Sequence, residues 1–186
     1  MIALFMGPSG SGKDTQTDLI EDRFNIRQFS TGDMLRAEAA KDTEKGNKIK
    51  KYLEEGKWVP TEITYELLEE KFLNGEIPHD NIMLNGVVRI PNQVEKLDKI
   101  LAKFGKTLDV VISFTLEEEE AIQRMLGRGR QDDKVENIRS RLKEYDQYFD
   151  PIFSAYRDRG ILKEIDAGGT IEGVHKKVVD ALNIKD

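Results

Sequence analysis

The sequence has no cysteine, and this absence removes several kinds of chemistry at once. Disulfides, cysteine-based zinc sites and thiol nucleophiles are all excluded in a chain of 186 residues without a single thiol. Histidine is scarce as well, because only His79 and His175 occur and they stand far apart in the sequence. We therefore do not expect a histidine-based metal site.

Long apolar runs and an excess of positive charge are also missing. The apolar segment 1–6 is too short for a signal peptide or a membrane span, so we expect a cytoplasmic protein without a membrane partner. The formal net charge is −6, and an acidic chain gains little from releasing the counterions of a polyanion. DNA and long RNA are therefore poor partners, and any phosphate chemistry must use local positive charge.

Apolar residues make up 38% of the chain and come in short periodic blocks, which predict one compact domain over residues 1–186. Buried strands are predicted at 2–6, 27–29, 81–84, 109–114 and 161–165. Helices are predicted at 13–24, twice within 31–55, and at 62–73, 91–103, 116–126, 135–159 and 170–182, and Pro151 could bend the helix that contains it. Because helices alternate with strands, the expected class is α/β, with a parallel sheet covered on both faces.

A glycine-rich segment that reads Gly-Pro-Ser-Gly-Ser-Gly-Lys-Asp-Thr follows the first predicted strand. Gly7, Gly12 and Lys13 match the G-x-x-x-x-G-K core of a phosphate-binding loop. Glycines let the backbone wrap around phosphate, the following helix adds its positive end, and the lysine supplies a point charge. The strict motif has Ser or Thr directly after the lysine to hold magnesium, whereas here Asp14 stands there and Thr15 follows. A plain strand-to-helix turn is the alternative, but the position of the segment argues against it.

Further motifs follow in order along the chain: Ser-Thr-Gly-Asp-Met-Leu-Arg at 30–36, Gly-Lys-Trp-Val at 56–59, Asn-Gly-Val-Val-Arg at 85–89 with Gln93 four residues later, an arginine-rich stretch over 124–141, and Ile-Asp-Ala-Gly-Gly at 165–169. Together with the glycine-rich loop, the chain resembles the adenylate kinase family of nucleoside monophosphate kinases over nearly its whole length. The resemblance implies a P-loop kinase fold with a five-stranded parallel sheet flanked by helices. It divides the chain into a core (1–29, 61–126 and 135–186), a helical insert for the nucleoside monophosphate (30–60) and a vestigial lid (127–134).

The resemblance also implies reversible phosphoryl transfer from ATP, or another nucleoside triphosphate, to AMP, giving two ADP with magnesium as cofactor. Residues that would bind the triphosphate are Gly10, Ser11, Gly12, Lys13, Asp14, Thr15, Arg124, Arg128 and Gly169. Residues that would bind AMP are Thr31, Arg36, Lys57, Val59, Gly86, Arg89, Gln93, Arg130 and Arg141. Among these, Arg36 and Arg89 would grip the phosphate of AMP and Gln93 would read the adenine edge. Magnesium would be held mainly by phosphates and water, with Thr15 as a candidate protein ligand.

The positive side chains in this set suit phosphoryl transfer. That reaction needs little covalent chemistry from the protein, but it does need two anionic substrates held in line while charge spreads over the moving group. Arginine offers a planar fork that matches phosphate oxygens. The expected catalytic residues are therefore Lys13, Arg89, Arg128, Arg130 and Arg141.

The sequence departs from the family pattern in three regions. Asp14 replaces the usual glycine; we expect its carboxylate to point to solvent, although it could repel phosphate or help to hold magnesium. Asn85 replaces an aspartate that supports hydrated magnesium, and Val87-Val88 replaces Phe-Pro. Between Arg128 and Asp132 only three residues remain, which are too few to close over a triphosphate as a lid.

These departures keep other functions open. A related kinase for UMP, CMP or several monophosphates is the nearest alternative. A nucleotide-binding regulatory protein that has lost turnover belongs to a different class, and the short lid and Asn85 would suit it. Retention of the lysine and the arginines argues against it, because binding alone would not need them all. A homo-oligomer, in which a neighbouring subunit covers the open phosphate site, is a further possibility.

Overall fold

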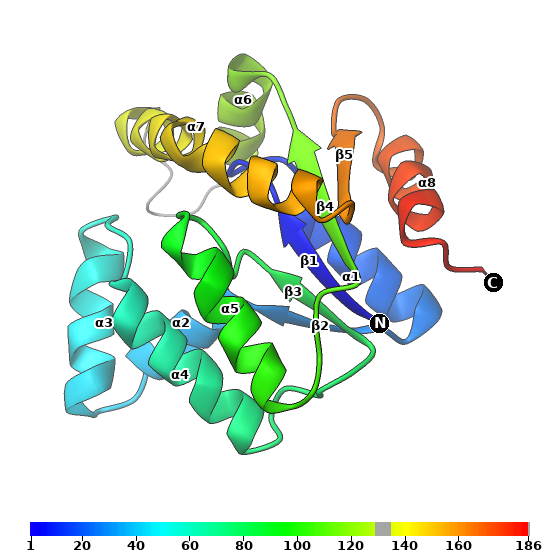
Figure 1. The fold of residues 1–186 in the computed structure, drawn as a ribbon. Helices are drawn as coiled ribbons and strands as arrows, with labels where there is room; N and C mark the ends of the chain where they lie inside the picture. Colours follow the sequence, from blue (N-terminus) through cyan, green and yellow to red (C-terminus); the bar gives the residue numbers. More distant parts are fainter. Residues whose placement is uncertain (129–134, 186) are drawn as a thin grey trace.

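A parallel five-stranded sheet forms the centre of the molecule (Figure 1). The structure is a computed structural model, and it describes residues 1–128 and 135–185. The strands are β1 (Ile2–Met6), β2 (Arg27–Ser30), β3 (Ile82–Asn85), β4 (Val110–Thr115) and β5 (Leu162–Asp166). They lie in the order β2-β3-β1-β4-β5, and every neighbouring pair is parallel. The α/β class and the five-stranded parallel sheet predicted from the sequence are confirmed.

Helices separate successive strands of the described chain, one in some connections and two or three in others. The helices are α1 (Lys13–Phe24), α2 (Thr31–Ala39), α3 (Glu44–Glu54), α4 (Thr61–Leu73), α5 (Asn92–Lys103), α6 (Glu118–Arg128), α7 (Val135–Asp158) and α8 (Ile171–Leu182). Most bounds differ from the predicted ones by one or two residues, and α7 runs through Pro151 as one helix. Within the described ranges, no helix is both long and apolar enough to cross a bilayer.

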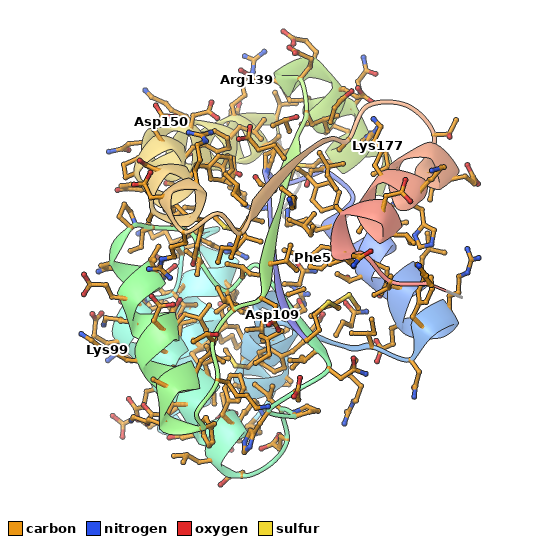
Figure 2. All side chains as sticks on the ribbon, turned by 45° about the vertical axis from the view of Figure 1, so that its right-hand side comes forward. Phe5, Lys99, Asp109, Arg139, Asp150 and Lys177 are labelled. Atoms are coloured by element: carbon orange, nitrogen blue, oxygen red, sulfur yellow. The ribbon has the colours of Figure 1, made fainter. Side chains whose placement is uncertain are left out.

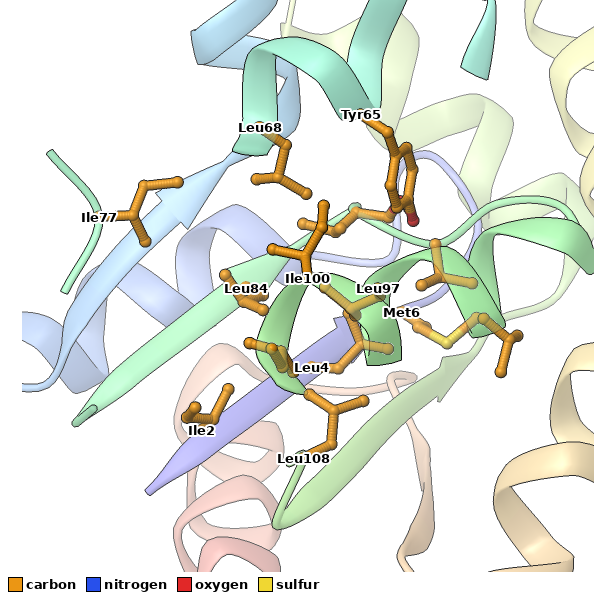
Figure 3. Close-up of a cluster of buried hydrophobic side chains, with 14 of the residues drawn as sticks. Ile2, Leu4, Met6, Tyr65, Leu68, Ile77, Leu84, Leu97, Ile100 and Leu108 are labelled. Atoms are coloured by element: carbon orange, nitrogen blue, oxygen red, sulfur yellow. The ribbon is translucent and has the colours of Figure 1, made fainter. Parts of the chain in front are cut away.

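Each face of the sheet buries its own hydrophobic cluster, because alternate residues of a strand point to opposite faces. Ile2, Leu4 and Met6 of β1 pack with side chains of α4 and α5 (Figure 3), and buried residues of α7 belong to the same cluster. Ala3 and Phe5 of the same strand pack on the other face against α1 and α8. The continuous apolar run of β1 is thus explained by a strand that is buried on both faces.

Charged side chains lie at the outside of these layers. Lys99 of α5, Asp150 of α7 and Lys177 of α8 extend away from the ribbon, whereas Phe5 lies inside it (Figure 2). The helices α2 and α3 occupy most of the stretch predicted as the insert at 30–60, and Met34 and Leu35 of α2 join the same core cluster as β1. The division into core, insert and lid stays a prediction.

Candidate active site

A cleft of about 1750 Å³ opens where the carboxyl ends of β1, β2, β3 and β5 meet. This is the edge at which parallel α/β sheets bind ligands. The cleft is lined by every predicted site residue whose side chain the structure describes: Gly10, Ser11, Gly12, Lys13, Asp14, Thr15, Thr31, Arg36, Lys57, Val59, Gly86, Arg89, Gln93, Arg124, Arg141 and Gly169. Arg128 is the last residue of α6, and Arg130 and most of the predicted lid lie outside the described residues. The individual roles of these residues stay predictions.

The glycine-rich loop follows β1 and is packed too tightly for side chains at two positions. Gly7 has φ +148° and Gly10 has φ +86°, both in the region that favours glycine. A Cβ at Gly10 would lie 2.8 Å from the carbonyl oxygen of Ala121 in α6, and one at Gly7 would lie 2.9 Å from Cβ of Phe114. The loop therefore needs glycine at both positions to reach its conformation.

The Lys13 ammonium is held across this loop. Its Nζ donates hydrogen bonds of 2.8 Å to the carbonyl oxygens of Gly7 and Pro8, and one of 3.3 Å to Oγ of Ser11. The helix α1 begins at Lys13, and its N-cap, Gly12, has no side chain that could bond to the first N–H groups. A positive helix end and an ammonium group therefore lie together at the loop, as an anion site requires.

Two of the departures from the family pattern touch one another. Asn85 ends β3 and is buried, with only 3% of its surface exposed, and its Nδ2 donates a 2.7 Å hydrogen bond to Oδ1 of Asp14. The Asp14 side chain is exposed, as expected, but it is held by this bond rather than turned freely to solvent. An aspartate at position 85 would instead bring two carboxylates within hydrogen-bond distance, so the amide at 85 matches the carboxylate at 14.

Three arginines give the cleft a concentrated positive charge. Arg36 is on α2, Arg89 precedes α5 and Arg141 is on α7. Arg89 is open toward the cleft, yet the surrounding protein removes enough water to lower its pKa below the ordinary value of an arginine. The charges of Arg141 and Arg36 add to this effect, and Asp14 opposes it. The guanidinium stays ionised at neutral pH. A bound anion would relieve both the lost hydration and the mutual repulsion of the arginines.

The Arg89 side chain is oriented by short-range contacts. Its Nε donates to the carbonyl oxygen of Gly86 at 3.2 Å, and its guanidinium carbon lies 5.8 Å from the ring centroid of Trp58. The Trp58 ring in turn lies 6.4 Å from the ring of Tyr148 on α7. These contacts place a fixed cation beside the only tryptophan of the chain.

Gln93, which the family resemblance assigns to the adenine edge, is engaged inside the protein. It is buried, and its Oε1 accepts hydrogen bonds from the backbone N–H of Arg89 at 2.7 Å and of Ile90 at 3.3 Å. Its Nε2 donates to Oγ1 of Thr61, the first residue of α4, at 3.0 Å. To hydrogen-bond an adenine base, the Gln93 amide would have to give up these protein partners. Recognition of adenine by Gln93 therefore stays a prediction.

Tyr65 is a residue of this region that the sequence did not single out. It lies on α4 with 5% of its surface exposed, and its hydroxyl donates to the carbonyl oxygens of Val87 at 2.9 Å and Gln93 at 3.1 Å. Burial raises the pKa of the Tyr65 hydroxyl well above its usual range, so the group stays protonated and able to donate. In the sequence, a tyrosine on the apolar face of a helix indicates only a core residue.

Arg124 joins α6 to the turn between β5 and α8. Its Nη2 donates to Oε1 of Glu120 at 2.6 Å and to the carbonyl oxygen of Ala167 at 3.0 Å. Gly169, in the same turn, has φ +95° and lines the cleft. The guanidinium therefore lies next to the turn that the resemblance assigns to the base of the triphosphate.

Comparison with known proteins gives a consistent result. A family model described as adenylate kinase matches residues 5–161. A protein of Pseudarthrobacter chlorophenolicus named adenylate kinase is 37% identical over 183 residues, which cover 96% of this chain and 95% of that protein. Proteins with the same name from Kocuria rhizophila and Thermobifida fusca are each 38% identical; the matches cover 96% and 98% of this chain, and 97% and 98% of those proteins.

Proposed function

The chain belongs to the adenylate kinase family, and on that premise we infer that it transfers the terminal phosphoryl group of ATP to AMP, forming two ADP. The observation that carries this inference is the convergence of the loop lysine and three arginines on one cleft. A nucleotide triphosphate and a monophosphate together bring several negative charges, and this cleft concentrates positive charge in a chain whose formal net charge is −6. The cleft volume of about 1750 Å³ also exceeds that of a site for one small ligand.

The donor's phosphates would be bound by the glycine-rich loop, where the N–H groups at the start of α1 and the Lys13 ammonium face an anion. Bound phosphate would compete with the Gly7 and Pro8 carbonyls for the ammonium protons. The phosphate of AMP would be gripped by Arg36 and Arg89. Arg141 would add positive charge near the moving group, where charge develops in the transition state.

Magnesium fits the chemistry of the loop without a preformed protein cage. Among the described residues, no group of three or more Asp, Glu, His or Cys side chains could hold a metal ion. The exposed oxygens of Asp14 and Thr15 are hard ligands of the kind that magnesium prefers. The ion would therefore be held mainly by phosphate oxygens and water, and when bound it neutralises part of the phosphate charge.

The small-molecule partners proposed here are ATP or another nucleoside triphosphate, and AMP. Since both are soluble metabolites, we propose the cytoplasm as the place of action. A homo-oligomer, in which a second copy covers the phosphates, would compensate for a short lid, and light scattering of the purified protein tests this by its mass.

The proposed reaction is tested by following product formation by phosphorus NMR with ATP, AMP and magnesium. We expect the appearance of ADP at twice the rate of ATP loss, since each ATP and AMP yield two ADP. Lys13→Met is the control, and it should lower kcat/KM by at least about 100-fold while the fold is retained. No ADP from the folded wild-type protein would refute the proposed function.

A further inference from the structure

The residue that follows the loop lysine carries a carboxylate at a position where magnesium is commonly held. In the general form of the phosphate-binding loop, a serine or threonine directly after the lysine places its oxygen on magnesium. Here Asp14 follows Lys13, lies in the first turn of α1 and lines the cleft. A carboxylate is a hard oxygen ligand of the kind that magnesium prefers, so the chain keeps an oxygen at this position and adds a negative charge.

The other acidic side chains of the cleft come from elements outside the loop. Among the described residues, four acidic side chains line the cleft, and Asp14 is the one that belongs to the glycine-rich segment. Asp33 is on α2, Glu54 is the last residue of α3 and Glu55 follows it. Asp33 and Glu55 form ion pairs with their own neighbours, Arg36 and Lys57. Asp14 is therefore the acidic residue that the fold places at the proposed site of the donor's phosphates.

The strand beside the loop ends in a neutral residue. In many P-loop proteins an acidic residue outside the loop also holds magnesium. Strand β3 lies beside β1 and ends at Asn85, which is 3% exposed and donates a hydrogen bond of 2.7 Å from Nδ2 to Oδ1 of Asp14. Carboxylates that hold metal ions are themselves commonly fixed by hydrogen bonds. The buried amide of Asn85 thus orients the carboxylate of the loop.

The charge of Asp14 acts on both proposed phosphate sites. Asp14 directly follows Lys13, which we assign to the donor's phosphates. Burial is the main cause that lowers the pKa of Arg89, and Asp14 is the neighbouring charge that raises it, so the carboxylate also acts on the residue assigned to the acceptor's phosphate. A fixed negative charge at this place repels phosphate oxygens, and a divalent cation bound between them turns the repulsion into attraction.

We propose that Asp14 supplies the protein carboxylate that binds the hydrated magnesium of the nucleotide, and that Asn85 is the positioning residue of this carboxylate. This inference rests on the proposed function, in which the loop binds the phosphates of ATP. A carboxylate in the first turn of α1 also complements the helix dipole. The dipole alone requires neither a buried amide partner nor a dependence of nucleotide binding on magnesium, and the second of these separates the two roles by experiment.

The chain offers a matched control on the same helix. Asp18 lies one turn further along α1, outside the lining of the cleft, and its carboxylate also accepts a hydrogen bond from a side-chain amide, that of Gln28. Asp14→Asn and Asp18→Asn therefore remove the same charge and alter the same kind of contact. A third variant, Asp14→Asn with Asn85→Asp, moves the carboxylate from the loop to the end of β3. Circular dichroism of each variant shows that it is folded.

The measurement is isothermal titration calorimetry with a non-hydrolysable ATP analogue, once with magnesium and once with EDTA. The ratio of Kd in EDTA to Kd in magnesium gives the magnesium gain. Asp14→Asn should lower this gain about 10-fold, as loss of a contact to a charged group implies, and should strengthen binding in EDTA because a repelling carboxylate is removed. Asp18→Asn should leave the gain within about 2-fold of the wild type. The exchange variant should return it to within about 3-fold.

Each result decides between the two proposals. Equal gains in the wild type and Asp14→Asn, or equal losses in Asp14→Asn and Asp18→Asn, would overturn the role of Asp14. An exchange variant with a gain no larger than that of Asp14→Asn would overturn the pairing of roles between positions 14 and 85. A wild-type protein that binds the analogue neither with nor without magnesium would instead refute the proposed function.

Discussion

The contact between Asp14 and Asn85 gives a prediction whose size can be worked out from the structure. Asn85→Asp replaces a 2.7 Å hydrogen bond to a carboxylate by two facing carboxylates. Two unit charges at that separation repel by about 1.5 kcal/mol in water and about 6 kcal/mol at an effective dielectric constant of 20. Asp14 is exposed but position 85 is buried, so the repulsion lies between these two figures, and the lost hydrogen bond adds to it. We expect the variant to lose at least about 2 kcal/mol of its free energy of unfolding at neutral pH.

The assay is urea unfolding, followed by circular dichroism, of the wild type, Asn85→Asp and the double variant Asp14→Asn with Asn85→Asp. The double variant exchanges the two groups, so an amide again faces a carboxylate and the net charge equals that of the wild type. We expect it to recover at least about half of the lost stability. Acid should also reduce the loss in Asn85→Asp, because a proton shared between the two facing carboxylates removes their repulsion.

Two results would refute this reasoning. Equal stability of Asn85→Asp and the wild type would show that the contact contributes little. A double variant as unstable as Asn85→Asp would show that position 85 is sensitive for a reason unrelated to Asp14.

Three further predictions concern the cleft. Arg89→Ala should lower kcat/KM at least about 100-fold without unfolding the protein, and near-normal turnover would remove this residue from the mechanism. Gly10→Ala should lower the free energy of unfolding by about 1–3 kcal/mol more than Gly105→Ala, as measured by thermal or urea unfolding. Both glycines have positive φ, but only a Cβ at Gly10 would meet a backbone atom, the Ala121 oxygen at 2.8 Å. Equal losses would show that the loop can shift. GTP, UTP and CTP should replace ATP as the donor with a loss in kcat/KM of at most about 10- to 200-fold, because stacking on Arg124 accepts any base. Steady-state rates with the four triphosphates test this, and turnover with ATP alone would disprove it.

Much of the fold follows from the sequence because its patterns are local. The apolar run of β1 and its glycine-rich end predict a buried strand that enters a turn and a helix, and the structure has that order. The ends of elements depend on pairing that the sequence does not display. Thr115, for example, continues β4 because it pairs with Asp166 of β5, and α6 then begins at Glu118 rather than at 116.

The sequence predicts the site residues that stand inside motifs. It does not predict contacts that arise only when distant parts of the chain pack together. Lys13, Arg36 and Arg89 stand inside recognisable motifs, and all three line the cleft. The bond between Asp14 and Asn85 joins residues 71 positions apart, and it exists because β3 lies beside β1 in the sheet. The contacts of Tyr65 arise in the same way, from the packing of α4 on the turn before α5. No local pattern in the sequence encodes such contacts.

The central claim is that this chain phosphorylates AMP, and a panel of acceptors tests it most directly. Initial rates of ADP or other nucleoside diphosphate formation are measured with ATP, magnesium and AMP, GMP, CMP or UMP in turn. The account predicts that AMP gives the highest kcat/KM, by at least about 10-fold over each of the other three. A higher kcat/KM with a pyrimidine monophosphate, or no diphosphate from any acceptor by the folded protein, would contradict it.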